Sequence, residues 1–188
     1  SKKKIIFKFF NKNNLNLISI GRLVHQKDHL CLLKAINLLK KDDNIKLLIF
    51  GDGYMKNSLI KFIKKNKLEK IIKIKDRVEN PYPYILKSDV MILTSRFEGL
   101  PNVLLEGLAL NKFIMSTDCP TGPKEILDNG RGGILFRIGD YIQLAKNIKN
   151  YNRKKREMIK LKKHGIKRLN RFNYKKNLNN YYYILNNL

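Results

Sequence analysis

Two glutamates with seven residues between them, Glu98 and Glu106, lie in the segment SRFEGLPNVLLE. A carboxylate can accept hydrogen bonds from two adjacent hydroxyl groups, so both acids are suited to binding hydroxyls of a ligand. The alternative is that Glu98 complements a helix start and Glu106 is a solvated helix residue. The run VLLEGLAL around Glu106 is otherwise apolar, where a solvated face is not expected. We therefore favour binding roles for both acids.

The residues between the two acids predict the start of a helix. Pro101 suits the first helical turn because its missing N–H would have no partner inside the helix. Gly99, just before it, allows a ligand to approach the backbone closely. The unpaired N–H groups and the positive dipole end of such a helix favour a phosphate in front of it.

A second candidate is the loop at residues 21–28 (GRLVHQKD). Gly21 allows a sharp turn, and Arg22 and Lys27 then lie on a loop leading into a helix, where both cations could hold a diphosphate. An ordinary turn with two solvated cations is the alternative, and this loop alone does not decide between them.

Two further loops carry weaker signals. Residues 51–53 (GDG) lack the third glycine and the following acid of a dinucleotide-binding motif, so we interpret them as structural. Residues 76–84 (DRVENPYPY) could line a pocket for a base or form a proline-rich turn before a short helix, and both interpretations stay open.

Short apolar runs alternate with segments of helical periodicity, which is typical of βαβ units. Strands are expected at 15–20, 45–50, 71–75, 90–93, 113–116 and 134–136, and helices at 28–40, 55–65, 102–110 and 141–151. The chain from residue 153 onward is expected to be basic and helical. This pattern predicts one Rossmann-like, doubly wound parallel sheet, in which ligands bind at the carboxyl ends of the strands.

The composition favours an anionic partner. The 188 residues include 40 Lys and Arg against 15 Asp and Glu, a formal net charge of +25. Nucleotides, nucleic acid or an anionic membrane surface would suit this charge, and a codon bias toward Lys, Asn and Ile explains it equally well. Cys31 and Cys119 have no metal-ligand or redox spacing, so reduced thiols and no metal site are expected. No apolar run approaches the roughly 18 residues of a membrane span.

Taken together, the loops resemble the donor-binding half of family 4 glycosyltransferases, also called glycosyltransferases group 1, which have the two-domain GT-B fold. The resemblance runs from about Leu15 to the end of the chain. Its motifs are ISIGRLVHQKD, LLIFGDG, IKDRVENPYPYILKSDVMILTS, SRFEGLPNVLLEGLA, STDCPTGPKEIL, GGILF and RFNY.

The resemblance implies a function for each loop. Arg22 and Lys27, with Gly21, match the pair that binds the donor diphosphate, and Arg77 and Val78 lie in the base-side loop. Glu98 matches the glutamate that contacts the transferred sugar, and Glu106 the one that holds the ribose hydroxyls. The backbone that faces the sugar and phosphate would be that of Gly99, Leu100, Pro101 and Asn102.

The implied reaction is transfer from a nucleotide sugar with retention of configuration and without a cofactor or obligatory metal. The donor is expected to be a UDP-hexose or UDP-N-acetylhexosamine, and the acceptor a glycan or lipid-linked glycan of a cell-surface polymer. The family's N-terminal acceptor domain is missing, so residues 1–14 are interpreted as a linker and 15–188 as the donor domain. This chain alone would bind donor but transfer sugar poorly. Asp76 replaces a glycine common in relatives, which puts the shape of the base-side loop in doubt.

Two other functions compete with this one. The C-terminal run YNRKKREMIKLKKHGIKRLNRFNYKK has the charge and interleaved aromatics of a nucleic-acid-binding module, but the glutamate pair would then have no function. A non-catalytic scaffold related to transferases is the other. The same basic run could rest on an anionic membrane, so we expect a cytoplasmic protein with peripheral contact to the inner face of the membrane.

Overall fold

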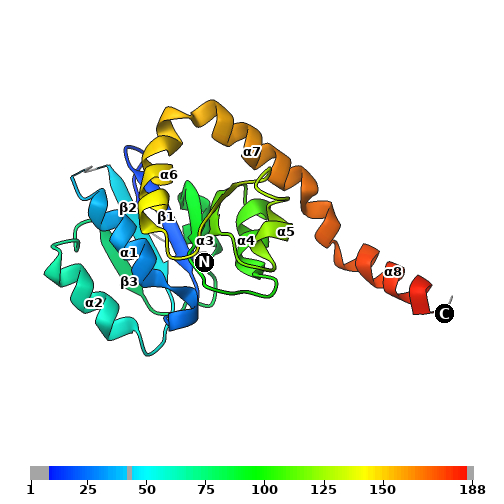
Figure 1. The fold of residues 1–188 in the computed structure, drawn as a ribbon, viewed down its shortest axis with the longest axis horizontal. Coiled ribbons are helices and arrows are strands. Elements are labelled where there is room, and N and C mark those ends of the chain that lie inside the picture. The colour runs from blue at the N-terminus through cyan, green and yellow to red at the C-terminus, as the bar shows by residue number, and fades with distance from the viewer. Residues whose placement is uncertain (1–8, 42–43, 186–188) are drawn as a thin grey trace, which may run out of the picture.

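The computed structural model describes residues 9–41 and 44–185, and these residues form helices around a central parallel sheet (Figure 1). The sheet has six strands in the order β3-β2-β1-β4-β5-β6. The strands are β1 (Leu15–Ile20), β2 (Ile45–Phe50), β3 (Ile72–Lys75), β4 (Val90–Leu93), β5 (Phe113–Thr117) and β6 (Ile134–Phe136). The predicted doubly wound α/β fold is therefore confirmed.

Two strand ends differ from the prediction by one residue. The N–H of Ile71 donates to the carbonyl of Leu68 at 2.9 Å and closes a turn, so β3 begins at Ile72. β5 extends to Thr117 because this residue still pairs with Phe136 of β6.

The strand order reverses between β1 and β4, which are hydrogen-bonded neighbours. The register places Leu17 opposite Val90 and Ile18 opposite Met91. In a doubly wound sheet, the crevice at this reversal is where ligands bind, outside the carboxyl ends of the strands. The loops that follow β1 and β4 therefore meet in space although they are far apart in sequence.

Helices cover both faces of the sheet (Figure 1). They are α1 (His29–Leu38), α2 (Lys56–Lys65), α3 (Tyr82–Lys87), α4 (Asn102–Ala109), α5 (Pro123–Ile126), α6 (Tyr141–Arg153), α7 (Lys155–Lys167) and α8 (Tyr174–Leu185). Two 3₁₀ turns, η1 (His25–Lys27) and η2 (Arg168–Phe172), precede α1 and α8.

The core is divided by the sheet into two clusters, because successive strand residues point to opposite faces. Leu47 and Ile49 of β2 belong to the cluster that α1, α2 and α6 cover. Leu48 and Phe50 belong to the cluster that α3, α4 and α5 cover. Both faces are buried, which explains the apolar run at residues 47–50 of β2.

The segment before β1 contributes to the second cluster. Phe10 is 7% exposed and packs there, so the packed body of the domain includes part of the segment for which a linker is expected. Residues 1–8 of that segment lie outside the described residues.

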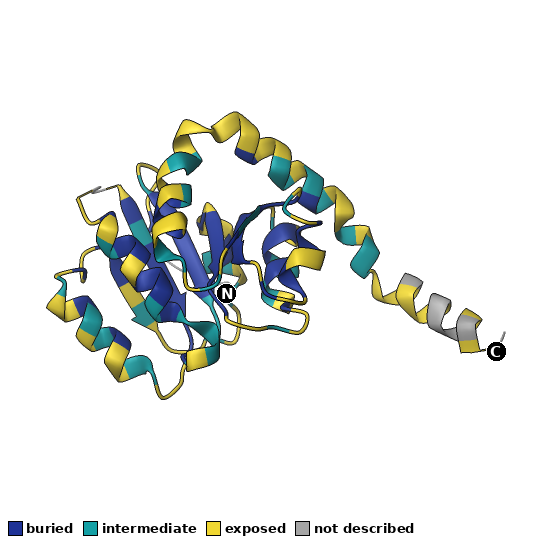
Figure 2. Cartoon of the chain, in the orientation of Figure 1, coloured by how far each residue is buried: buried dark blue, intermediate teal, exposed yellow. Residues whose placement is uncertain are grey.

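The two C-terminal helices differ in how closely they pack on the rest of the domain. α7 packs on α4 and β5, whereas α8 runs away from the body and its described residues are exposed (Figure 2). In the described part of the chain, no helix has both the length and the apolar character needed to cross a membrane.

Candidate functional site

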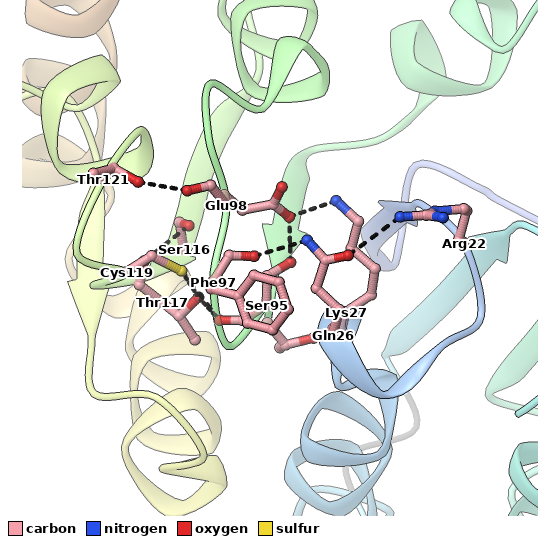
Figure 3. Close-up of polar contacts among 11 residues, drawn as sticks. Arg22, Gln26, Lys27, Ser95, Phe97, Glu98, Ser116, Thr117, Cys119 and Thr121 are labelled. Carbon is pink, nitrogen blue, oxygen red and sulfur yellow. Dashed lines mark hydrogen bonds and ion pairs between the residues drawn. The ribbon is translucent and has the colours of Figure 1, made fainter.

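Lys27 and Glu98 meet across the crevice between β1 and β4. Lys27 ends η1 after β1, Glu98 lies in the loop between β4 and α4, and Lys27 Nζ forms an ion pair with Glu98 Oε1 (Figure 3). Their side chains are 15% and 7% exposed, so water screens the pair much less than a surface ion pair. Ser95 Oγ donates to the same Glu98 oxygen at 2.5 Å. The structure thus brings two predicted site residues into direct contact.

Gln26, which sequence reasoning missed, joins the same two loops. Its Nε2 donates to the carbonyl of Phe97 at 3.0 Å, and its Oε1 accepts from Arg22 Nη2 at 3.3 Å (Figure 3). The backbone N–H of Arg96 donates to the carbonyl of Gln26 at 2.8 Å. Gln26 therefore orients Arg22, although no property of an uncharged glutamine in the sequence indicates this role.

The loop after β5 supports the loop after β4. Thr117 Oγ1 donates to the carbonyl of Ser95 at 2.6 Å, and Thr121 Oγ1 donates to the carbonyl of Glu98 at 2.5 Å. Gly122 has φ 79°, and a Cβ there would lie 1.9 Å from the carbonyl oxygen of Gly99. This close approach requires glycine and fixes the backbone on both sides of Glu98.

A cavity of about 660 Å³ opens at the carboxyl ends of the first three strands. It brings together five of the residues predicted to bind ligand, which are Gly21, Arg22, Arg77, Val78 and Glu106. The other residues that line it are Ile20, Phe50, Gly51, Asp52, Glu79, Pro81 and Tyr82. Lys27, Glu98 and residues 99–102 do not line this cavity.

Glu106 lies on α4, is half-buried and borders the cavity. Its carboxylate has no hydrogen-bond or ion-pair partner among residues 9–41 and 44–185. A partly desolvated carboxylate is stabilised by donors, so this oxygen pair is available for hydroxyl groups of a bound molecule.

Ion pairs fix the loop between β3 and α3, which borders the cavity. Lys56 forms ion pairs with Asp76 and, at 3.4 Å, with Asp52, whose other oxygen accepts from the N–H of Arg77 at 3.1 Å. This backbone hydrogen bond is the main reason that the pKa of Asp52 lies below its ordinary value. Asp76 therefore anchors this loop through Lys56.

The glycine at the end of β2 has a structural role, as predicted. A Cβ on Gly51 would lie 1.9 Å from the carbonyl oxygen of Gly21, so the first two loops touch backbone to backbone. This contact closes one side of the cavity.

Residues 99–102 lie at the start of α4, where Gly99, Leu100 and Asn102 are exposed and Pro101 is buried. No heavy atom lies within 4 Å of the position of a Cβ on Gly99, and Leu100 is 47% exposed. α4 begins at Asn102, and its N-cap residue, Pro101, makes no side-chain capping bond. The N–H groups of the first turn are thus not capped by the preceding side chain, which suits an anion.

Both cysteines are free and buried, as predicted. Burial raises the pKa of Cys31 to about 12 and also raises the pKa of Cys119, so both are neutral thiols at pH 7. Within the described ranges, no three His, Cys, Asp or Glu side chains are grouped as a metal site would require.

The sequence profile of a family described as "Glycosyl transferases group 1" matches residues 1–168. The chain belongs to this family.

The chain matches part of longer curated glycosyltransferases. It is 39% identical over 117 residues to "Uncharacterized glycosyltransferase MJ1059" of Methanocaldococcus jannaschii, covering 62% of this chain and 29% of the relative. It is 33% identical over 133 residues to a Campylobacter jejuni protein, covering 71% of this chain and 36% of that protein. That protein is named "N-acetylgalactosamine-N,N'-diacetylbacillosaminyl-diphospho-undecaprenol 4-alpha-N-acetylgalactosaminyltransferase". The chain thus spans about a third of the length of these curated relatives.

The fold is shared with solved structures. The crystal structure of Anabaena Alr3699/HepE in complex with UDP superposes with a TM-score of 0.83 at 20% identity, covering 94% of this chain and 50% of that one. At this identity the likeness establishes the fold alone.

Proposed function

We propose that this glycosyltransferase chain binds the nucleotide-sugar donor, a UDP-hexose or UDP-N-acetylhexosamine, as the C-terminal half of a retaining GT-B enzyme. The observation that carries the proposal is the cavity that gathers Arg22, Arg77 and Glu106 beside the crevice with Lys27 and Glu98. The UDP bound in the similar structure of Anabaena Alr3699/HepE supports the choice of base.

In this proposal Arg22 and Lys27 bind the diphosphate of the donor. Gln26 holds Arg22 at the crevice, and Lys27 is nearby in the same loop. The diphosphate would give Lys27 a second anionic partner besides Glu98, and the start of α4 would add N–H donors. Neutralising the diphosphate stabilises it as a leaving group, and no metal is needed for this step in the proposal.

In this proposal the carboxylates of Glu106 and Glu98 bind hydroxyl groups of the donor. Glu106, which has no partner within the described part of the chain, would accept from the two ribose hydroxyls. The base would lie against the loop that contains Arg77 and Val78. Glu98, at the ion pair with Lys27, would contact the transferred sugar. This order places the nucleotide over β2 and β3 and the sugar over β4.

The acceptor is proposed to be a glycan or lipid-linked glycan of a cell-surface polysaccharide, held by a second domain. The Campylobacter jejuni relative, whose name contains a diphospho-undecaprenol acceptor, supports this class. In this proposal the cavity at the carboxyl ends of β1, β2 and β3 holds the donor and the second domain holds the acceptor, so the chain alone is expected to bind donor without appreciable transfer. Sustained sugar transfer by the isolated 188 residues would contradict this part.

The test is calorimetric titration of the chain with UDP, comparing wild type with Glu106→Ala. Losing charge-assisted hydrogen bonds to two hydroxyls should weaken binding by at least about tenfold. Glu157→Ala is the matched control, because Glu157 is an exposed helix acid that pairs only with Lys154 among the described residues.

The outcomes separate the possibilities. UDP binding that Glu106→Ala abolishes and Glu157→Ala leaves intact supports the proposal. No binding of UDP by wild type overturns it. Equal binding by all three proteins would place the nucleotide elsewhere and also overturn it.

A further inference from the structure

Ser95 follows β4 and is completely buried at the centre of the crevice loops. A buried serine hydroxyl needs a hydrogen-bond partner, and here the partner is the carboxylate of Glu98. This serine was not among the residues singled out from the sequence.

The backbone of Ser95 is fixed from the neighbouring strand. Its carbonyl accepts from Thr117 Oγ1 at 2.6 Å and from Cys119 Sγ at 3.2 Å (Figure 3). Since burial keeps the Cys119 thiol protonated, the thiol remains a donor at neutral pH. Thr117, at the end of β5, and Cys119, just after it, therefore fix the backbone that carries the Ser95 hydroxyl.

The hydroxyl of Ser95 helps to determine which carboxylate oxygen of Glu98 is left for a ligand. It donates to Glu98 Oε1 at 2.5 Å, and Lys27 Nζ contacts the same oxygen. The side-chain hydrogen bonds of Glu98 with the described residues all go to Oε1. Oε2 is the oxygen that remains for a ligand, while Thr121 fixes the backbone of the same residue.

We propose that Ser95 is a positioning residue that holds Glu98 Oε1 so that Oε2 meets a hydroxyl of the sugar carried by the nucleotide. The inference rests on the proposed function and deepens it, because it assigns recognition of the sugar part, separate from the nucleotide, to the Ser95–Glu98 pair. Ser95 itself does not touch the donor.

The experiment compares two ligands on the intact chain by calorimetry. UDP reports on the nucleotide, and UDP-glucose and UDP-N-acetylglucosamine report on the sugar. Ser95→Ala is expected to weaken the tighter-binding UDP-sugar by about tenfold and to change UDP affinity by less than about twofold. Ser95→Cys keeps a similar volume with a weaker donor and gives the same selective loss should the alanine variant not fold.

Ser116→Ala is the matched control. Ser116 is also completely buried, lies on the adjacent strand and donates to the carbonyl of Thr117 at 3.1 Å, away from Glu98. Ser116→Ala removes an equivalent buried hydroxyl, so this substitution should leave the ratio of the UDP and UDP-sugar affinities unchanged.

A double-mutant cycle shows whether Ser95 acts through Glu98. In a Glu98→Ala background, Ser95→Ala should cause no further loss of UDP-sugar affinity, because the group it positions is gone. Additive losses, equal weakening of UDP and UDP-sugar, or no effect of Ser95→Ala would each overturn the inference. If wild type binds UDP, these results count against the inference alone; if it binds neither ligand, the proposed function fails and the inference with it.

Discussion

His164 Nε2 lies 2.6 Å from Asp128 Oδ2, and this contact joins α7 to the segment between α5 and β6. The Asp128 side chain is 6% exposed, and Arg131 Nη2 lies 3.0 Å from its other oxygen. Arg168 and Arg171 approach the same carboxylate to 3.7 and 3.6 Å. One acid thus holds basic side chains of α7 and η2 against the sheet.

Asp128→Asn should destabilise the protein at neutral pH. The hydrogen bond from His164 is the main cause that lowers the pKa of Asp128 from 3.8 to about 2. A lowered folded-state pKa means that the stabilisation is complete above pH 4, approximately the unfolded value, and is lost as the pH falls through 2. Thermal denaturation should show a lower Tm for the variant at pH 7 and a difference that shrinks toward pH 2.

Asp140→Asn is the control for this substitution. Asp140 accepts from the N–H of Gln143 at 2.8 Å as the N-cap of α6, and asparagine caps a helix about as well as aspartate. A Tm difference for Asp128→Asn that stays constant from pH 7 to pH 2 would contradict the role given to the carboxylate.

His29→Leu should flatten the dependence of stability on acidic pH. Burial, with a smaller contribution from the charge of Lys27, lowers the pKa of His29 from 6.5 to about 4. The unfolded chain therefore binds a proton that the folded chain refuses, and the free energy of unfolding falls as the pH drops from 6.5 to 4. The loss over that window is roughly 3 kcal/mol. Denaturant titrations at several pH values measure it.

The matched control for this histidine is His25→Gln, because His25 is exposed. Its stability profile should follow that of wild type. His29 Nδ1 has no partner among the described residues, so His29→Leu should also cost little at neutral pH. A variant with the wild-type slope between pH 6.5 and 4 would show that another group is responsible.

Phe10→Ala tests whether the packed domain begins before β1. Phe10 is 7% exposed in the cluster that contains Ile18 and Phe50, so its truncation should lower the free energy of unfolding by about 3 kcal/mol. Phe97→Ala, at a side chain 59% exposed, should change stability by less than about 0.5 kcal/mol. Equal effects of the two substitutions in urea denaturation would argue against packing by Phe10.

Elements of the fold followed from local patterns. The short, mainly apolar segment at residues 45–50 predicted a strand, and β2 has those bounds, with both of its faces covered by helices. Pro101 predicted the start of α4, and in the structure it is the N-cap residue directly before Asn102. The error at Ile71 arose because a turn bond to Leu68 competes with the strand, and an apolar residue fits either structure.

Candidate site residues were predicted where charge or backbone freedom is unusual for the local sequence. Glu106 stood out in an apolar run, and Arg22 and Lys27 followed a glycine at a strand end. Gln26 and Ser95 were not predicted. Gln26 bonds to Phe97 in another loop, and the Ser95 hydroxyl reaches Glu98 only through the fold of its own loop, so neither residue type carries a signal in isolation.

The sequence by itself determined the α/β fold class and the six strands along the chain, because apolar periodicity and glycine and proline positions act locally. Its loop motifs indicated the glycosyltransferase family. Only the tertiary structure decided how these loops combine. Pairing of β1 with β4 places Lys27 against Glu98 although 71 positions separate them. It also decided that Thr117 holds the backbone of Ser95, because such contacts arise from packing between distant segments and not from spacing along the chain.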